Sequence, residues 1–314
     1  KTHGHFGSRQ AELHRVSAVG LSLPLGCLAM QGLPGQNRPV RQQRRPRLAS
    51  AAVLSAAVLA LVPLRPSVAP PRASLAVFGA TGLTGREAVY QALQRGESVV
   101  ALARDPSKLL VPKGSGGGDA DGPLSDPKLT VIQGDVTKAE DVAKVITSDT
   151  TGVLVSLGGK TADVGETMLT DGTTNIIDAM KKVGTKRVAV VSSIGVGNSE
   201  DQAPFFFKIL MWTMMKKIFE DKNRQEELFT KPGAPGADLE YTMVRPGGLT
   251  VEKPTGVINV IEGEAGSIAR ADVADFCLGA LLEKGFPYLR GTPCISSVGG
   301  TSWVKDRSAK AREG

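Results

Sequence analysis

The chain has 314 residues, of which 41% are hydrophobic, so it is long and apolar enough to bury the core of one large or two small domains. Its formal net charge is +7, and the positive charge lies in residues 1–74, which hold ten basic residues and one acidic residue. The rest of the chain holds 28 basic and 30 acidic residues and has no dense basic patch, which excludes nucleic-acid binding by the folded part. All three histidines lie in the first 14 residues and the three cysteines form no CxxC pair, which excludes a Ser-His-Asp hydrolase, a Cys-His protease, a zinc site and a His-ligated metal enzyme in the rest of the chain.

Residues 1–72 have the composition of a targeting segment. Residues 1–47 are rich in Arg, Gln, Ser, Gly and Pro and nearly free of acids, so they resemble a transit peptide and are expected to be largely disordered. The apolar run at 48–62 is shorter than the about 20 residues that span a bilayer, which favours a signal-type segment over the alternative of a retained membrane anchor. We expect a plastid (chloroplast) destination, with the mitochondrion as the alternative.

From residue 73 onward, short apolar runs alternate with helical segments, a pattern typical of βαβ units. The predicted strands cover 74–78, 97–103, 129–133, 152–157, 187–192 and 239–244, with a candidate last strand at 294–298. The predicted helices cover 86–95, 172–183 and 221–228, and the Gly- and Asp-rich residues 112–126 predict a surface loop. The pattern predicts a single α/β domain over 73–300, a doubly wound parallel sheet of the Rossmann fold, followed by a tail at 301–314.

The first predicted strand leads directly into Gly79-Ala80-Thr81-Gly82-Leu83-Thr84-Gly85, which opens the next helix. Such glycines let the backbone turn tightly and approach a pyrophosphate, whose charge then rests on the helix N-terminus. A tight strand-to-helix turn also uses glycine for steric reasons alone. A strand before the motif and a helix after it favour the dinucleotide site.

The end of the second predicted strand carries Arg104, 19 residues beyond Gly85, where a dinucleotide fold places the residue that contacts the adenosine ribose. An arginine there accommodates a 2′-phosphate, so NADP(H) is favoured over NAD, and Lys108 adds charge. The alternative is an exposed arginine at a strand end, and the neighbouring Asp105 argues for it. After the third strand, Asp135 is placed to meet the adenine, although an Asx turn or a helix cap explains it as well.

Seven segments in chain order, GATGLTG, ARDPSKL, GDVT, DGTTNIIDAMKKVG, VVSSIG, YTMVRPGGL and IARADVADF, resemble the atypical short-chain dehydrogenase/reductases of the NmrA-like and biliverdin reductase B-like group, particularly their plastid members. The resemblance covers about residues 75–300. It implies that NADP(H) is held by Gly79, Thr81, Gly82, Leu83, Gly85 and Arg104, with Asp135 near the adenine. It also implies that Leu157 and Gly158 line the cofactor, that Ser192 and Ser193 face the nicotinamide and substrate, and that the segment Arg245-Pro246-Gly247-Gly248 forms the far wall.

The chain departs from typical short-chain dehydrogenases, which use a Tyr-x-x-x-Lys pair to exchange a proton with the substrate. None of its three tyrosines has a lysine four residues on. Lys222 stands where the family's lysine is expected, but Ile218 occupies the position four residues before it. Lys222 either holds the nicotinamide ribose, with Ser192 or Ser193 orienting a substrate oxygen, or is one more solvated charge. Without the tyrosine, either water supplies the proton or the chain has no turnover.

Residues 204–219, PFFFKILMWTMMKKIF, are unusually apolar for a segment that follows a strand. One interpretation is a lid that carries Phe206, Met211 and Trp212 over a flat aromatic substrate. A second is a helix that faces a membrane or a protein partner. The simplest is a helix that packs on the sheet, because Met and aromatic side chains fill irregular cores well.

Two hypotheses of function follow. The first is an NADPH-dependent reductase of a small conjugated acceptor such as a flavin, a quinone or a tetrapyrrole, with a small-molecule substrate and no metal. The second is a non-catalytic NADP(H)-dependent redox sensor or assembly factor, which the missing tyrosine and the apolar segment favour. An isomerase or epimerase is disfavoured because such enzymes normally use that tyrosine.

Overall fold

The computed structural model describes residues 73–159, 165–263 and 265–297. The predictions made for residues 1–72, including the apolar run at 48–62, lie outside the described residues, as do those for the tail at 301–314 and for the final residue of the last predicted strand, Val298.

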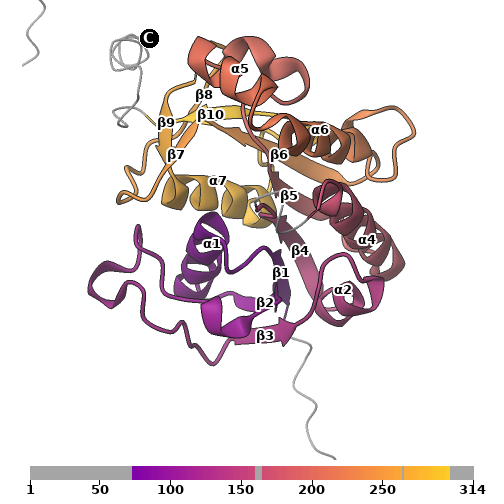
Figure 1. Ribbon diagram of the computed structural model, residues 1–314. Helices are drawn as coiled ribbons and strands as arrows, with labels where there is room; N and C mark the ends of the chain where they lie inside the picture. The colour runs from indigo at the N-terminus through magenta and orange to yellow at the C-terminus, as the bar shows by residue number, and fades with distance from the viewer. Residues whose placement is uncertain (1–72, 160–164, 264, 298–314) are drawn as a thin grey trace, which may run out of the picture. The chain divides into compact units, whose positions relative to one another are not determined.

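Within the described residues, the main sheet has eight strands in the order β3-β2-β1-β4-β5-β6-β10-β8 (Figure 1). Neighbouring strands are parallel except at the edge, where β8 pairs with β10 in the antiparallel sense. The strands are β1 Ser74–Phe78, β2 Ser98–Ala103, β3 Leu129–Gln133, β4 Thr150–Val155, β5 Arg187–Val191, β6 Glu240–Pro246, β8 Asn259–Val260 and β10 Cys294–Ser296. Two further short strands, β7 Gly248–Thr250 and β9 Ser267–Ala269, pair with each other in parallel.

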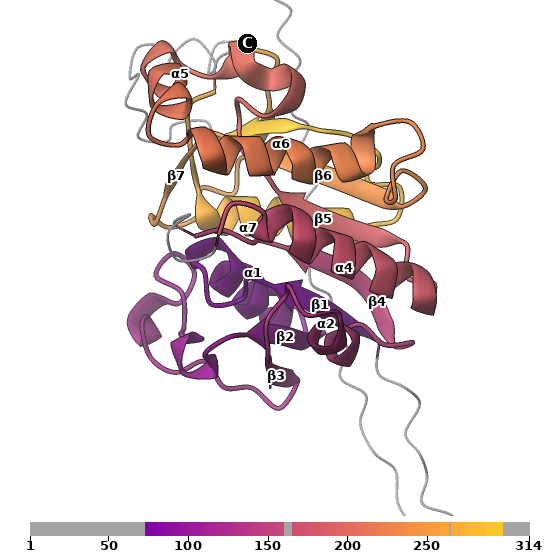
Figure 2. The same cartoon turned by 45° about the vertical axis from the view of Figure 1, so that its right-hand side comes forward.

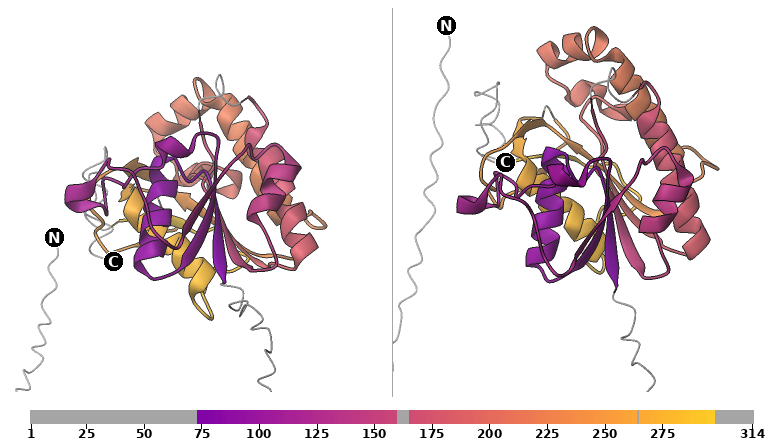
Figure 3. Two further views of the ribbon diagram at one scale, coloured as in Figure 1. Left: turned by 90° about the horizontal axis from the view of Figure 1, so that it is seen from below. Right: turned by 60° about the horizontal axis from the view of Figure 1, so that its bottom comes forward.

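Helices cover both faces of the main sheet (Figures 2 and 3). One face is covered by α1 Leu83–Gln94 and α7 Arg270–Leu282. The other is covered by α2 Ala139–Val145, α4 Met168–Val183 and α6 Lys216–Thr230. The helix α5 Phe205–Trp212 precedes α6 and packs against it, and three short 3₁₀ helices are η1 Pro106–Lys108, η2 Gly117–Asp119 and η3 Gly197–Gln202. This arrangement confirms a single Rossmann-like α/β domain with a doubly wound sheet.

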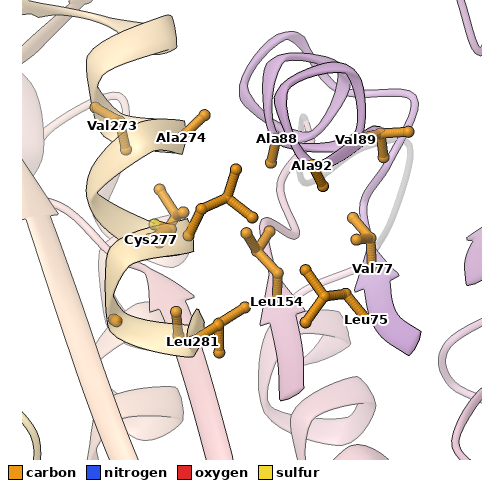
Figure 4. Close-up of a cluster of buried hydrophobic side chains, with 14 of the residues drawn as sticks. Leu75, Val77, Ala88, Val89, Ala92, Leu154, Val273, Ala274, Cys277 and Leu281 are labelled. Atoms are coloured by element: carbon orange, nitrogen blue, oxygen red, sulfur yellow. The ribbon is translucent and has the colours of Figure 1, made fainter. Parts of the chain in front are cut away.

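The central strands read as continuous apolar runs because both of their faces are buried. In β1, Leu75 and Val77 point to the layer between the sheet and the helices α1 and α7, whereas Ala76 and Phe78 point to the opposite layer. Figure 4 shows the first layer, where strand side chains meet Ala88 and neighbouring residues of α1 and α7. Full burial of one such Leu, Val or Phe side chain contributes about 1.5–3 kcal/mol.

The six strands predicted over 74–244 are all present, with ends that move by at most two residues. The helix expected at 221–228 is longer and runs from Lys216 to Thr230, and the loop expected at 112–126 contains η2 and a bridge between Leu110 and Pro123. The sequence pattern did not reveal α2, α7 or the short strands β7, β8 and β9. Strands of two or three residues show no periodicity, so a sequence pattern cannot reveal them.

Candidate functional site

The order of the strands reverses between β1 and β4, and ligands of doubly wound sheets bind beyond the carboxyl ends of the strands at such a point. A cavity of about 310 Å³ opens there, which we call the switch-point cavity. Residues that follow β1, β2, β3 and β4 contribute to it. Its lining residues are Phe78, Gly79, Thr81, Gly82, Leu102, Ala103, Arg104, Gly134, Asp135, Val136, Thr137, Ser156, Leu157, Gly158 and Met168.

A wider cleft of about 630 Å³ lies elsewhere, between α1 and the loop that follows β2. Its lining includes Tyr90, Leu93 and Gln94 near the end of α1 and residues 118–120 and 122–126 of the loop. The cleft is therefore at the amino-terminal side of the parallel strands, because α1 runs back across the sheet. Its larger volume does not make it the better candidate, since the switch point is where strand ends and a helix N-terminus converge.

The turn after β1 needs two of its glycines for steric reasons. Gly79 has φ +80°, and a Cβ on it would lie 2.2 Å from the carbonyl oxygen of Ser156. A Cβ on Gly85 would lie 2.1 Å from the carbonyl oxygen of Gly79. Gly82 is different, because its nearest neighbour would be 3.2 Å away and it lines the cavity. Steric crowding therefore requires glycine at positions 79 and 85 and is milder at Gly82.

The start of α1 faces the cavity through this turn. Gly82 is the N-cap residue of α1, and no side chain caps the helix there. Backbone N–H groups in the first turn of a helix lack partners within the helix and attract anions. The start of α1 can therefore receive a phosphate group.

Arg104 and Asp105, the two neighbours at the end of β2, have separate roles. Arg104 is exposed and lines the cavity. The Asp105 carboxylate accepts hydrogen bonds from the hydroxyl of Ser107 at 2.6 Å and from its backbone N–H at 3.1 Å, and these bonds lower the pKa of Asp105. Lys108 adds an ion pair at 3.4 Å. Asp105 is thus turned into η1 and, unlike Arg104, is not among the residues that line the cavity.

Asp135 lies at the cavity and also forms an Asx turn. It lines the cavity, and its Oδ1 accepts hydrogen bonds from the backbone N–H of Thr137 at 2.9 Å and from its hydroxyl at 2.8 Å. The backbone bond from Thr137 is the main reason that the pKa of Asp135 is lowered. The Asx turn therefore holds an ionised carboxylate at the cavity wall.

Ser192 belongs to a buried network that the sequence analysis missed. Its hydroxyl donates to Oε1 of Glu226 at 2.5 Å. Arg245 donates to the same carboxylate through Nε at 3.1 Å and Nη2 at 2.6 Å, and its Nη1 donates to Oδ1 of Asn198 at 2.7 Å. The side chains of Arg245 and Glu226 are 4% and 3% exposed. The sequence offered one partial signal, the arginine of YTMVRPGGL, and none for its partner.

The remaining predicted residues are not among the described residues that line this cavity. Ser193 is half-buried just beyond β5, and Pro246 is buried at the end of β6, where its carbonyl accepts from Ile194 at 3.2 Å. Leu83 is 42% exposed in the first turn of α1. The structure therefore brings together seven predicted residues, namely Gly79, Thr81, Gly82, Arg104, Asp135, Leu157 and Gly158.

Lys222 lines a smaller cavity of about 30 Å³, here called the side cavity, which shares Gly158 and Met168 with the switch-point cavity. Its Nζ donates to the carbonyl of Val191, at the end of β5, across 3.5 Å. Burial lowers the pKa of Lys222 to about 8. Ile218, one turn earlier on α6, lines the same cavity, so an apolar side chain stands where a tyrosine hydroxyl was sought.

Asp221 lines the side cavity and connects α6 to the start of α4. Its buried carboxylate accepts from the backbone N–H of Leu169 at 2.8 Å and of Thr170 at 3.2 Å, in the first turn of α4. A carboxylate at a helix N-terminus satisfies free donors and matches the helix dipole. Asp221 thereby fixes Met168 and Lys222, its neighbours on the two helices, relative to each other.

Stability should depend on pH through Lys222. Because its pKa falls from 10.5 to about 8 on folding, the unfolded chain binds more protons than the folded chain between these values, so the free energy of unfolding rises with pH across this window. From pH 7 to pH 10, the wild type should gain about 1–3 kcal/mol relative to Lys222→Met. Urea unfolding of both proteins at the two pH values measures this difference. If the free energies of unfolding of the two proteins change equally with pH, Lys222 is solvated in the folded chain.

Among the described residues, no group of three or more His, Cys, Asp or Glu side chains is placed to hold a metal ion. The candidate site consists of backbone turns at the strand ends, the arginine Arg104, the ordered carboxylate of Asp135 and the half-buried lysine Lys222.

A family model described as NAD(P)H-binding matches residues 79–284. A chloroplastic protein of Arabidopsis thaliana is 34% identical over 221 residues, which cover 66% of this chain and 71% of that protein. Sanguinarine reductase of Eschscholzia californica is 28% identical over 256 residues, which cover 65% of this chain and 82% of the reductase.

Two solved structures share the fold. ChuY, an anaerobillin reductase from Escherichia coli O157:H7, has a TM-score of 0.56 at 23% identity and covers 72% of this chain and 98% of its own. A short-chain dehydrogenase/reductase from Veillonella parvula in complex with NADP has a TM-score of 0.56 at 15% identity and covers 73% and 96%.

Proposed function

The chain belongs to the NAD(P)H-binding family, and from this premise we propose that it is an NADPH-dependent reductase of a small conjugated acceptor such as a flavin, a quinone or a tetrapyrrole. The observation that carries the proposal is the switch-point cavity, in which the glycine turn, Arg104 and Asp135 meet at the ends of four neighbouring strands. The predicted resemblance to NAD(P)-binding reductases is confirmed at the level of this family.

The residues present fit a dinucleotide. Gly82 and Gly158 line the cavity, and among the described residues other than its chain neighbours no atom lies within 4 Å of a Cβ on Gly158. The start of α1 would hold the pyrophosphate, and Asp135 would lie near the adenine. Arg104 would bind a 2′-phosphate, whereas Asp105, the residue suited to a free 2′-hydroxyl, is tied to Ser107. These contacts support NADPH over NADH.

The reduced nicotinamide would supply the hydride. Lys222 would hold the nicotinamide ribose from the side cavity, which adjoins the switch-point cavity at Gly158. Ser192 donates to Glu226 and would act as a positioning residue, which leaves Ser193, at the same strand end, to orient a substrate oxygen. A conjugated acceptor suits this site, because the negative charge that it gains is delocalised and water or Lys222 supplies the proton without a phenol.

We also propose a plastid location. Residues 1–72 have a transit-peptide composition, and two relatives from Arabidopsis thaliana, 34% and 32% identical over parts of their length, are chloroplastic proteins.

Replacement of Arg104 by Ala tests the choice of cofactor. We expect the affinity for NADPH to fall about 10- to 100-fold, because a charged hydrogen bond of about 1.5–3 kcal/mol is lost, while the affinity for NADH stays the same. Fluorescence titration of the purified chain with each nucleotide measures both values. Lys182→Ala is the matched control, since Lys182 is an exposed basic residue at the end of α4 and is outside the cavity lining. Equal losses for both nucleotides would refute a role at the 2′-phosphate.

NADPH consumption against a panel of flavins, quinones and carbonyl compounds tests the reductase itself. Turnover with flavins or quinones supports it, and background rates throughout contradict it. A redox sensor is the second candidate, favoured because none of the described residues that line the two cavities is a tyrosine. A sensor must bind its partner with affinities that differ between NADP⁺ and NADPH, and equal affinities would exclude it.

A further inference from the structure

The ammonium group of Lys222 has unused hydrogen-bond donors. It carries three N–H donors, and among the described residues only the carbonyl oxygen of Val191 accepts from it. These two atoms are 3.5 Å apart, whereas a strong bond of this type measures about 2.7–3.2 Å. The side chain is half-buried, and a partly desolvated cation that lacks acceptors is unfavourable. The free donors of Lys222 therefore indicate a ligand that supplies an acceptor.

The two carboxylates whose charges act on Lys222 are bound by other donors. Asp221 accepts from backbone N–H groups at the start of α4, and Glu226 accepts from Ser192 and Arg245. Among the described residues, neither carboxylate forms an ion pair with Lys222. Burial lowers the pKa of Lys222 to about 8 and the two charges oppose this effect, so the amine is mostly protonated at pH 7. Lys222 thus presents a positive charge that no carboxylate in the described residues pairs with.

The side cavity, which Lys222 lines, suits one small polar group. Its volume of about 30 Å³ is close to the volume of one water molecule in the liquid, so no ring fits inside it. Gly158 and Met168 line both this cavity and the switch-point cavity. A ring bound where the two cavities meet would therefore turn one oxygen toward Lys222. Leu169 and Ile218 add apolar walls, which strengthen the attraction between that oxygen and the ammonium.

We propose that Lys222 binds the carbonyl oxygen of the acceptor in the side cavity and protonates it, which selects quinones among the acceptors named above. This inference rests on the proposed reductase function. The quinone takes a hydride, with its two electrons, from NADPH and becomes a hydroquinone monoanion, while NADPH becomes NADP⁺. Nζ gives a proton to the oxyanion, and water returns a proton to Nζ. Val191 and the nicotinamide ribose use two of the three N–H donors, which leaves the third for this oxygen.

Two acceptors of opposite charge test the role of Lys222. Reduction of 1,4-naphthoquinone produces an oxyanion, whereas N-methylacridinium is a cation that becomes neutral when it accepts a hydride and needs no proton. With the full chain and saturating NADPH, Lys222→Met should lower turnover of the quinone about 10²- to 10⁴-fold and leave turnover of the acridinium intact. Lys216→Met is the matched control, since Lys216 lies on the same helix, is 68% exposed and is outside the lining of the side cavity.

The pH dependence of turnover separates proton donation from a structural role. The protonated amine is the active form, so quinone turnover by the wild type should fall as the pH rises through about 8, and well above this value by about tenfold for each pH unit. Acridinium turnover should show no such fall. Lys222→Arg keeps the positive charge over this range, so it should retain part of the quinone turnover and lose the fall near pH 8.

Binding of a phenol provides a readout that needs no turnover. The probe is 4-nitrophenol, whose yellow phenolate carries the same charge as the hydroquinone monoanion. At about pH 6 in the presence of NADP⁺, the wild-type chain should increase the phenolate absorbance, because a nearby cation lowers the pKa of the phenol. The Lys216→Met variant should do the same, and the Lys222→Met variant should not.

Three outcomes would overturn the proposal. Equal losses for both acceptors in Lys222→Met would show that Lys222 serves the nucleotide alone. Unchanged quinone turnover in that variant would show that water supplies the proton, and equal phenolate absorbance with both chains would show that Lys222 binds no oxyanion. If the wild type reduces neither acceptor, the reductase function fails by itself, and the phenolate absorbance still decides whether Lys222 forms an oxyanion site.

Discussion

Replacement of Gly158 by Val should lower the affinity for NADPH at least about a hundredfold and leave the unfolding temperature unchanged. Gly158 lines both the switch-point cavity and the side cavity, and among the described residues other than its chain neighbours no atom lies within 4 Å of a Cβ built on it. Its φ lies outside the left-handed region, so a β-branched residue introduces no backbone strain. The added side chain would therefore fill space in front of the cavity wall, where the proposed nucleotide would lie.

Gly118→Val is the matched control for this experiment. Gly118 is also exposed, has no protein atom within 4 Å of its ideal Cβ, and lines the wider cleft rather than the switch-point cavity. NADPH titration and thermal unfolding of the two variants separate a local block from a loss of stability. Undiminished binding in Gly158→Val would mean that the nucleotide binds elsewhere, and weakened binding in Gly118→Val would point to the cleft.

Replacement of Arg245 by Met should lower the free energy of unfolding by about 3–5 kcal/mol, because it leaves the Glu226 carboxylate buried without its cation. Both side chains are almost fully buried, and Arg245 supplies two of the three hydrogen bonds recorded on that carboxylate. The network ties β6 to α6 and, through Ser192, to the end of β5. Its loss should therefore loosen the strand end that carries Ser193.

Urea unfolding without nucleotide measures this effect, with two controls. Lys231→Met removes the exposed ion pair with Glu227 on the same helix and should change stability by less than about 1 kcal/mol. The double variant Glu226→Leu, Arg245→Met should recover most of the loss, since apolar residues of similar volume can replace a buried ion pair. A loss below about 1 kcal/mol for Arg245→Met alone would show that water reaches the pair.

Two neighbouring residues at the end of β2 have side-chain directions that the sequence does not determine. Arg104 and Asp105 are adjacent and suit different riboses, and the sequence favoured the arginine without showing where the aspartate points. Ser107 and Lys108 hold the aspartate in η1, whereas the arginine lines the cavity. The direction of a side chain at a strand end depends on the turn that follows the strand. A pattern of residue types does not specify that direction.

For the segment at 204–219, the sequence does not determine which face of the helix is buried. Its composition left a lid, a docking helix and a packing helix open as alternatives. The structure separates the two faces of α5, because Met211 packs against Phe219 whereas Ile209 and Trp212 are exposed. Both faces are apolar, so helical periodicity alone could not tell which of them the domain would bury.

The sequence by itself determined the doubly wound sheet and the glycine turn that opens α1, because apolar runs, helical periods and tight turns are encoded by residues close together in the chain. Seven of the residues predicted to hold the cofactor, two of them on the family resemblance alone, line the switch-point cavity, because parallel strands end at one edge of a sheet. Only the tertiary structure decided the network of Ser192, Glu226 and Arg245. Ser192 lies just beyond β5, Glu226 lies 34 residues later on α6, and Arg245 lies another 19 residues later on β6. Burial of a charge pair is favourable only when the folded backbone brings its partners within hydrogen-bonding distance, and no local pattern records that distance.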